Sequence, residues 1–240
     1  MKPYRLRVLQ QLSDEDYCAR KAMCDELLRL HQENDDFLFN VFWSDEATFH
    51  LSGCVNKHNC IIWGYENPNN ITEVPRVSPK VNVWVAFSSK KLIGPFFFPN
   101  DTVKATDYLV MLQTFFVPEL KRRRCFSRAF FQQDGAPPHW STNVREFLNN
   151  TFPQRWIGRG GWVSWAPRSP DLAPPDFFLW GHIKNLVYAK QHDNIECLKH
   201  SITTAFNEID ANMLKRTVEH CITRFQMCSN KNGGHIEQLL

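Results

Sequence analysis

Several features are missing from this sequence, and each absence narrows the class of protein. No apolar run approaches the ~20 residues that a helix needs to cross a bilayer, so we expect no membrane span. The first dozen residues contain charge but no uninterrupted apolar stretch, so we expect no secretory signal. The chain has no internal repeat and no low-complexity segment, which argues against a repeat array or a compositionally biased tail.

The eight cysteines are scattered and include no C-x-x-C pair. Together with the missing signal, this pattern predicts reduced thiols, many of them buried. A zinc loop could be imagined at Cys54, His58 and Cys60, but a second ligand pair at the usual spacing is absent. We therefore expect no zinc site there.

Composition and charge favour a globular protein with a polyanionic partner. The 240 residues are enough for one large or two small domains, and 43% hydrophobic with 22% charged residues is ordinary for a soluble fold. The net charge of +3 says little, but basic residues concentrate in one stretch. That stretch holds Lys121, Arg122, Arg123, Arg124, Arg128, Arg145, Arg155, Arg159 and Arg168. It suits a nucleic acid, and the alternative is an ordinary solvated surface.

Hydrophobic patterning predicts a mixed α/β domain. Residues 12–33 read as a helix capped by Ser13, and the apolar run 37–43 reads as a strand buried on both faces. Further strands are expected at 47–51, 60–64, 81–87, 93–99 and 128–133. Helices are expected from Thr106 or Asp107 to 120, and over 141–150, 175–189, 194–208 and 211–228. Strands followed by alternating helices and strands indicate one sheet flanked by helices.

Three aspartates stand at the edges of apolar segments. Asp45 directly follows F-L-F-N-V-F-W-S, and Asp134 directly follows A-F-F-Q-Q. Asp176 lies between a proline pair and F-F-L-W. Alternation along the first strand places Asp45 on a buried face and turns Glu46 the other way. Asp134 should lie at the carboxyl edge of its strand, where ligands bind in open α/β sheets, and Asp176 in the first turn of its helix.

Three converging carboxylates would repel one another unless a cation neutralised them. Two Mg²⁺ or Mn²⁺ ions held by such oxygens would suit phosphodiester chemistry, one activating the attacking hydroxyl and one stabilising the leaving oxygen. Each aspartate taken singly could equally be a turn former or a helix cap. Asp171 is a rival for the third position, but it lies five residues before Asp176 and would not share its direction. His139 could assist near the metal or simply order a turn, and Arg168 could bind phosphate or pair with Asp171.

The three motifs together resemble the catalytic blocks of mariner-superfamily transposases. The resemblance rests on V-F-W-S-D-E-A-T-F, F-Q-Q-D-G-A-P-P-H and S-P-D-L-A-P-P-D-F-F-L-W-G, supported by V-N-V-W-V-A-F, R-W-I-G-R-G-G-W and the terminal G-G-H-I-E-Q-L-L. It spans nearly the whole chain, and the branch it suggests is that of insect genomic copies. It implies an α/β RNase H-like fold, a mixed sheet with antiparallel first strands flanked by helices.

The resemblance also implies the activity and its residues. It implies DNA cleavage at transposon ends and strand transfer with two divalent cations, Mg²⁺ or Mn²⁺, and no small-molecule cofactor. The catalytic and metal-binding acids map to Asp45, Asp134 and Asp176 rather than Asp171. DNA is the expected partner, a homodimer the expected assembly and the nucleus the expected location. Among the basic residues, we expect DNA contacts from Arg122, Arg123, Arg155, Arg159 and Arg168.

Two departures from the family pattern bear on function. Residues 135–175 separate the second and third acids, a longer spacing than in the best-known mariner elements, and the Gly/Trp-rich stretch 155–166 could use the extra length to line DNA or be a surface loop. The chain also begins at what resembles the linker, so we expect the usual helix-turn-helix units to be absent. We divide it into a helical linker (1–36), the catalytic domain (37–190) and a C-terminal helical extension (191–240).

Three functions follow from these residues. The first is a metal-dependent transposase catalytic domain, favoured by the presence of all three acids. The second is an inactive or domesticated relic that binds nucleic acid or other proteins. The third is another RNase H-like nuclease acting on RNA or junctions, which the S-P-D-L-A-P-P-D block disfavours.

Overall fold

A five-stranded mixed sheet forms the centre of the fold, with the strand order β3-β2-β1-β4-β5. The computed structural model describes residues 10–53 and 78–239. The first three strands are antiparallel: β1 (Val41–His50), β2 (Lys80–Phe87) and β3 (Leu92–Phe97). The two short strands β4 (Phe130–Gln132) and β5 (Trp156–Ile157) run parallel to β1 on its other side. This confirms the predicted α/β class with antiparallel first strands.

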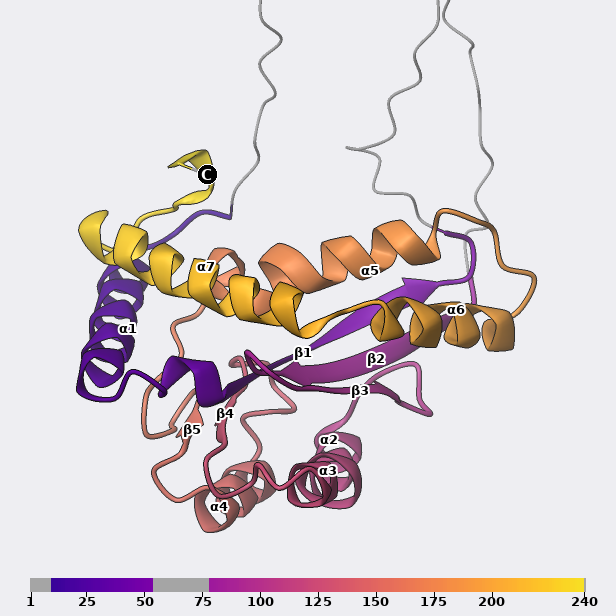
Figure 1. The fold of residues 1–240 in the computed structure, drawn as a ribbon, viewed down its shortest axis with the longest axis horizontal. Helices are drawn as coiled ribbons and strands as arrows, with labels where there is room; N and C mark the ends of the chain where they lie inside the picture. Colours follow the sequence, from indigo (N-terminus) through magenta and orange to yellow (C-terminus); the bar gives the residue numbers. More distant parts are fainter. Residues whose placement is uncertain (1–9, 54–77, 240) are drawn as a thin grey trace, which may run out of the picture.

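Helices cover both faces of the sheet (Figure 1). On one face lie α5, α6 and α7, with α1 beside the far end of α7; on the other lie α2, α3 and α4. A π-helical turn, Leu112–Phe116, joins α2 to α3, and another, η4 (Pro175–Leu179), leads into α5. The helices are α1 (Asp14–Glu33), α2 (Ala105–Met111), α3 (Val117–Arg122), α4 (Thr142–Thr151), α5 (Trp180–Val187), α6 (Ile195–Asn207) and α7 (Ala211–Asn230).

Strand β1 connects the two hydrophobic layers because its side chains alternate between faces. Val41 and Trp43 are fully buried in the cluster that α1 and α7 build, whereas Phe42 is buried in the cluster of α2, α3 and α4. Burying three large side chains fixes the register of β1, since a slip by one residue would exchange the two faces. The residues that follow on β1 are therefore held rigidly.

The N-terminal helix α1 belongs to the same core. Ser13 and Asp16 form the capping box that starts it, and acids fill its first turn, where the helix dipole favours them. Its buried side chains Met23 and Leu27 pack in one cluster with Phe225 of α7. The predicted segment boundaries at 36 and 190 stay predictions, although α1, β1 and α7 share this core.

Several helices and strands begin or end at other residues than predicted. The predicted strands 37–43 and 47–51 are one continuous strand, β1, preceded by a 3-10 turn at Leu38–Asn40. Pairing with β2 continues from Trp43↔Phe87 to His50↔Lys80, so the polar Ser-Asp-Glu segment does not interrupt it. The helix expected from Thr106 or Asp107 starts earlier, at Ala105, with Lys104 as its N-cap. The predicted strand 60–64 and the Cys54–Cys60 segment lie outside the described residues.

Two predictions from absences concern the described part of the chain. No helix there combines the length and apolar character that a membrane crossing requires. All six cysteines in the described ranges are free, and three of them, Cys24, Cys221 and Cys228, are buried.

Candidate active site

The ends of two parallel strands bring Asp45 and Asp134 to one edge of the sheet. The β1–β4 ladder ends at the pair Trp43↔Gln132, and each aspartate lies two residues beyond that pair in its own strand direction. Asp45 remains inside β1, paired with Val85 of β2, while Asp134 begins the loop after β4. Because β4 has ended, the flank of Asp45 that would face a neighbouring strand opens into a cleft.

Asp176 reaches the same cleft from the π-helical turn η4. The cleft has a volume of about 460 Å³, and Asp45, Asp134 and Asp176 all line it, together with Glu46 and Arg168. The structure thus brings the three predicted acids together, although they come from three separated segments. Asp45 is half-buried and Asp176 is exposed, so the cleft is open to a ligand from the side of η4.

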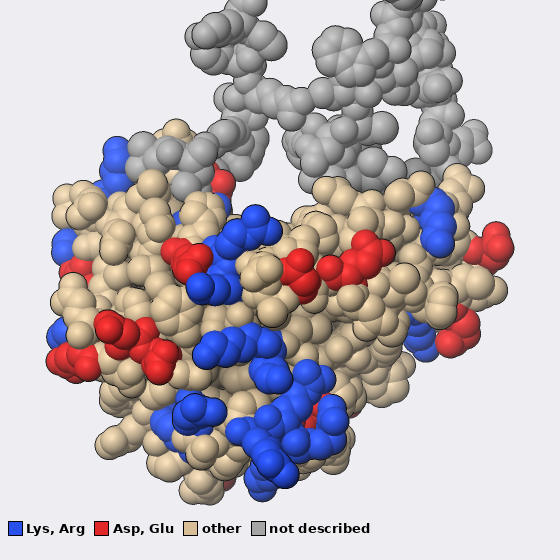
Figure 2. All heavy atoms as spheres, in the orientation of Figure 1, with Lys and Arg blue, Asp and Glu red and all other residues tan. Residues whose placement is uncertain are grey.

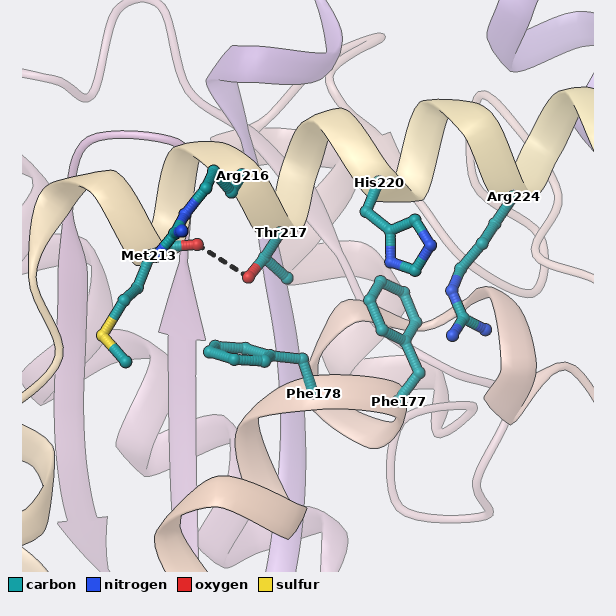
Figure 3. Close-up of a pocket in the computed structure, with 7 residues that line it drawn as sticks. All are labelled: Phe177, Phe178, Met213, Arg216, Thr217, His220 and Arg224. Atoms are coloured by element: carbon teal, nitrogen blue, oxygen red, sulfur yellow. Dashed lines mark hydrogen bonds between the residues drawn. The ribbon is translucent and has the colours of Figure 1, made fainter. Parts of the chain in front are cut away.

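The two aromatic residues that follow Asp176 pack against α7 (Figure 3). Phe177 lies between His220 and Arg224 of α7, with the Arg224 guanidinium 4.0 Å from the ring centroid. Phe178 lies below Thr217, whose hydroxyl donates to the Met213 carbonyl at 2.7 Å. Helix α7 therefore anchors η4 by packing, and the turn presents its one carboxylate toward the sheet edge.

The electrostatics of the cleft confirm that the carboxylates interact. Burial, then the charges of Asp176 and Glu46, raise the pKa of Asp45 well above its usual range, opposed by a 2.7 Å hydrogen bond that Trp180 Nε1 donates to Asp45 Oδ2. Asp176 is exposed at the mouth of the cleft, but partial loss of hydration there and the charge of Asp134 raise its pKa to about 6. In both groups the surroundings therefore favour the protonated carboxyl over the carboxylate.

A histidine supplies the counter-charge for Asp134. His139 Nδ1 lies 2.6 Å from Asp134 Oδ1, and His139 Nε2 lies 3.3 Å from Glu46 Oε1. Burial opposes protonation of the ring, but the Glu46 and Asp134 charges outweigh it and raise the pKa of His139 to about 10. Burial likewise opposes ionisation of Asp134, yet the hydrogen bond and charge of His139 keep the pKa of Asp134 below its usual value.

His139 therefore both orders the turn and places one positive charge between Asp134 and Glu46. Its ring packs on Tyr108 with centroids 4.1 Å apart, and the Tyr108 hydroxyl donates to Gln133 Oε1 at 3.0 Å. Glu46 is on the opposite strand face from Asp45, as alternation predicts, but it still lines the cleft and contacts His139. Sequence reasoning set Glu46 aside and missed this bridge. The one available signal was the histidine five residues after Asp134.

The donor set fits a hard divalent cation. Carboxylate oxygens are the ligands that Mg²⁺ and Mn²⁺ prefer. Burial first and neighbouring acids second raise the pKa values of Asp45 and Asp176, and a bound cation would oppose both effects. Within residues 10–53 and 78–239, however, no group of three or more His, Cys, Asp or Glu side chains is already arranged to hold a metal ion. Asp134 Oδ1 is turned to His139 and Ala136, and Asp45 Oδ2 to Trp180. The metal-binding roles of the three acids stay predictions.

Asp171, the rival of Asp176, has a structural partner. Its carboxylate accepts hydrogen bonds of 2.8 and 2.7 Å from Arg20 of α1, and both side chains are almost completely buried. Arg20 also donates to the carbonyls of Gly233 and Arg168. The pair ties α1 to the turn before η4 and to the end of α7. Asp171 does not line the cleft that holds Asp45 and Asp134, which supports the choice of Asp176.

The five arginines predicted to contact DNA differ in how they are engaged. Arg168 pairs with Asp16 at 2.6 Å, not with Asp171, and it lines the cleft. Arg122 and Arg123 both pair with Glu119, and Arg155 donates to backbone carbonyls at 126, 127 and 129. Arg159 is exposed. Figure 2 shows Lys and Arg side chains gathered on the lower part of the face shown, over the region of α3. The DNA contacts stay predictions.

Two transposases are similar to this chain in sequence. The Tc1 transposase of Caenorhabditis elegans is 24% identical over 195 residues, which are 80% of this chain and 67% of that protein. The mariner Mos1 transposase of Drosophila mauritiana is 26% identical over 125 residues, half of this chain. The chain is a homologue of the Tc1 and mariner transposases. No model of a protein family matches the sequence.

The fold agrees with this homology over nearly the whole chain. The structure of a Mos1 transposase paired-end complex with the left transposon end superposes with a TM-score of 0.81 at 23% identity, over 99% of this chain and 68% of that one. The Mos1 catalytic domain alone gives a TM-score of 0.75 at 22% identity, and all of that domain is covered. The predicted RNase H-like fold is therefore confirmed. This transposase homologue spans about two thirds of the Tc1 protein and 32% of the Mos1 protein.

Proposed function

We propose that this chain is a transposase catalytic domain that cleaves DNA strands at transposon ends and joins them to target DNA. The observation that carries the proposal is the cleft at the sheet edge, where Asp45, Asp134 and Asp176 come together. The homology to Tc1 and mariner transposases and the shared fold support the same reading. The Mos1 structures include complexes with transposon-end DNA, which supports DNA as the partner here.

The acids of the cleft are proposed to hold two divalent cations, Mg²⁺ or Mn²⁺. Solved structures of the Mos1 catalytic domain with Mg and with Mn support this choice, as does the all-carboxylate donor set. When bound, such ions would neutralise the three carboxylates and stabilise the negative charge that develops on the transferring phosphate. A homodimer, as the paired-end complexes of Mos1 suggest, and a nuclear location complete the proposal.

The residues of this chain perform the positioning. Strand β1 and helix α7 fix Asp45 and Asp176, Trp180 orients the Asp45 carboxylate, and His139 holds Asp134 ionised. In strand cleavage, a water oxygen bonds to phosphorus while the bond to the leaving ester oxygen breaks. In strand transfer, a DNA hydroxyl takes the place of water. Rigid acids serve both steps because catalysis of this kind depends on positioning and charge neutralisation.

Nicking of supercoiled plasmid in the presence of Mn²⁺ tests the proposal. Wild-type protein should convert the plasmid to the open circular form, and Asp134→Ala should lower the rate by at least about 100-fold, since a metal ligand supplies several kcal/mol. The matched control is Asp193→Asn, an exposed aspartate in the loop before α6, which should nick like wild type. Equal nicking by wild type and Asp134→Ala would refute the assigned site. Salt-sensitive DNA binding without cleavage by wild type would favour the nucleic-acid-binding relic.

A further inference from the structure

Two arginines share one tryptophan ring beside the candidate active site. Trp140 ends the loop that begins after Asp134, Arg145 lies in the first turns of α4, and Arg159 lies in the loop after β5. The guanidinium carbon of Arg145 is 4.2 Å from the Trp140 ring centroid, and that of Arg159 is 4.4 Å from it. We call these three side chains the Arg–Trp–Arg stack.

The glycines of the 158–161 loop make this arrangement possible. Gly160 has a positive φ of 77°, and a Cβ added there would lie 2.7 Å from a ring carbon of Trp140. A Cβ on Gly158 would lie 3.1 Å from the carbonyl oxygen of Gln133, just before Asp134. The loop can therefore lie against Trp140 and the end of β4 only because these positions carry no side chain. This gives a physical reason for the Gly/Trp-rich composition.

The stack stands at the rim of the cleft. A Cβ on Gly135 would contact the side chain of Arg159 at 3.8 Å, and Gly135 both lines the cleft and follows Asp134 directly. The loop between Asp134 and Trp140 is held from inside, because Gln133 Nε2 donates to the His139 carbonyl at 3.1 Å. Asp134 and Trp140 are thus the two ends of one braced loop, and a ligand at Asp134 has Arg159 as a near neighbour.

The two guanidiniums have no acidic partner within the described ranges. Neither arginine forms an ion pair there, and the one hydrogen bond found for either is from Arg145 Nε to the Trp140 carbonyl at 3.2 Å. Arg159 is exposed, and Arg145 and Trp140 are partly buried. Two neighbouring cations without an acid repel each other, and an anion between them or beside them relieves that repulsion. Stacking on an indole leaves the N–H edges of a guanidinium free to donate.

We propose that the Arg–Trp–Arg stack binds consecutive phosphates of the DNA strand that enters the active-site cleft. The proposal rests on the proposed function and adds to it a place for the strand next to the reacting phosphate. Arginine suits the task because its planar donors match phosphate oxygens, and phosphate contacts fix the register of a bound strand without reading its sequence. Trp140 aligns the two cations, so it is a positioning residue.

The test is the salt dependence of DNA binding, measured by fluorescence anisotropy with a labelled duplex in EDTA so that cleavage does not interfere. Arg145→Gln and Arg159→Gln should each reduce the slope of log K against log salt by about 0.9, the value for one lost duplex phosphate contact. Binding to unrelated sequences should weaken by the same factor. Arg159→Lys should retain the slope because the charge remains, and it should bind more weakly because the planar stack is lost.

Two further variants separate a binding role from a structural one. Lys199→Gln on α6 removes one charge outside the stack and should leave the slope unchanged. Trp140→Leu should weaken binding several-fold without a change in net charge, and its melting curve shows whether it is folded. If Arg145→Gln and Arg159→Gln are folded and keep the wild-type slope, the stack only braces the loop and the proposal is overturned. Plasmid nicking by wild type judges the proposed function separately, because it does not depend on these variants.

Discussion

Replacing Asp171 by asparagine removes a charge that faces Arg20 in the protein interior. Arg20 is 0% exposed and Asp171 is 4% exposed, so neither side chain can turn to water when its partner is changed. Removing one member of such a buried pair leaves an uncompensated charge and costs about 3–5 kcal/mol. For a domain of this size, each kcal/mol corresponds to about 2–4 °C in melting temperature, so the expected decrease is roughly 6–20 °C.

The assay is urea unfolding followed by tryptophan fluorescence, together with a thermal melt, for Asp171→Asn, Asp176→Asn and wild type in EDTA. Asp171→Asn should unfold at a clearly lower urea midpoint with a similar slope. Asp176→Asn should be at least as stable as wild type, because it removes a carboxylate that Asp134 repels. In the nicking assay the order reverses: Asp176→Asn should be inactive, while the Asp171→Asn molecules that remain folded should retain activity.

A double-mutant cycle with Arg20→Leu and Asp171→Leu measures how far the two residues act as a pair. The double variant should be less destabilised than the two single variants added together, because no unpaired charge remains. If Asp171→Asn has the same midpoint as wild type, the buried pair is not important for stability. If it also loses nicking while Asp176→Asn retains it, the assignment of the third acid is wrong.

Three further predictions concern the cleft. Because the pKa of His139 is raised, its pairing with Asp134 stabilises the metal-free protein fully below about pH 6.5, and this stabilisation should vanish as pH rises through about 10. In His139→Gln, the curve of unfolding free energy against pH should be flatter over this range. Because the pKa of Asp176 is raised, its ionised form destabilises the fold at pH values above the pKa of the unfolded chain. Asp176→Asn should therefore raise the free energy of unfolding by about 1 kcal/mol at pH 8, after solvent screening, and leave it unchanged below pH 3. An equal increase at both pH values would contradict an origin in the charge of Asp176. Trp180→Phe removes the hydrogen bond to Asp45, so Mn²⁺-dependent nicking should fall about tenfold at pH 7 and recover toward pH 9; a uniform loss would point to misfolding instead.

The convergence of the three acids could be predicted from the sequence because it depends on local patterns. Alternation along β1 placed Asp45 on its face, the end of an apolar run placed Asp134 at a strand end, and the proline pair placed Asp176 at a helix start. The carboxyl ends of parallel strands lie at the same edge of a sheet, so these local patterns were enough to predict that Asp45 and Asp134 lie close together. The sequence favoured Asp176 over Asp171 because side chains five residues apart do not point the same way. The structure adds a physical reason, since Asp171 forms a buried ion pair with Arg20.

The rest depends on contacts between residues far apart in the chain. Arg20 and Asp171 are 151 positions apart, and nothing near either residue indicates the other. The bridge from Asp134 through His139 to Glu46 requires that the loop after β4 fold back over β1. Strand β5 has only two residues, too few for periodicity, and its place is set by pairing with β4. The prediction divided β1 at its polar Ser-Asp-Glu segment, whereas pairing with β2 continues through that segment.

The most direct test of the central claim is anomalous X-ray diffraction from crystals of the full chain soaked in Mn²⁺. The claim is that Asp45, Asp134 and Asp176 form one cation site. It predicts anomalous peaks about 2.0–2.3 Å from carboxylate oxygens of Asp45 and Asp134, with Asp176 on the same ion or on the adjacent one. It also predicts that these peaks disappear in Asp134→Ala. Saturating Mn²⁺ with no peak in the cleft, in crystals where the three carboxylates are ordered, would contradict the account.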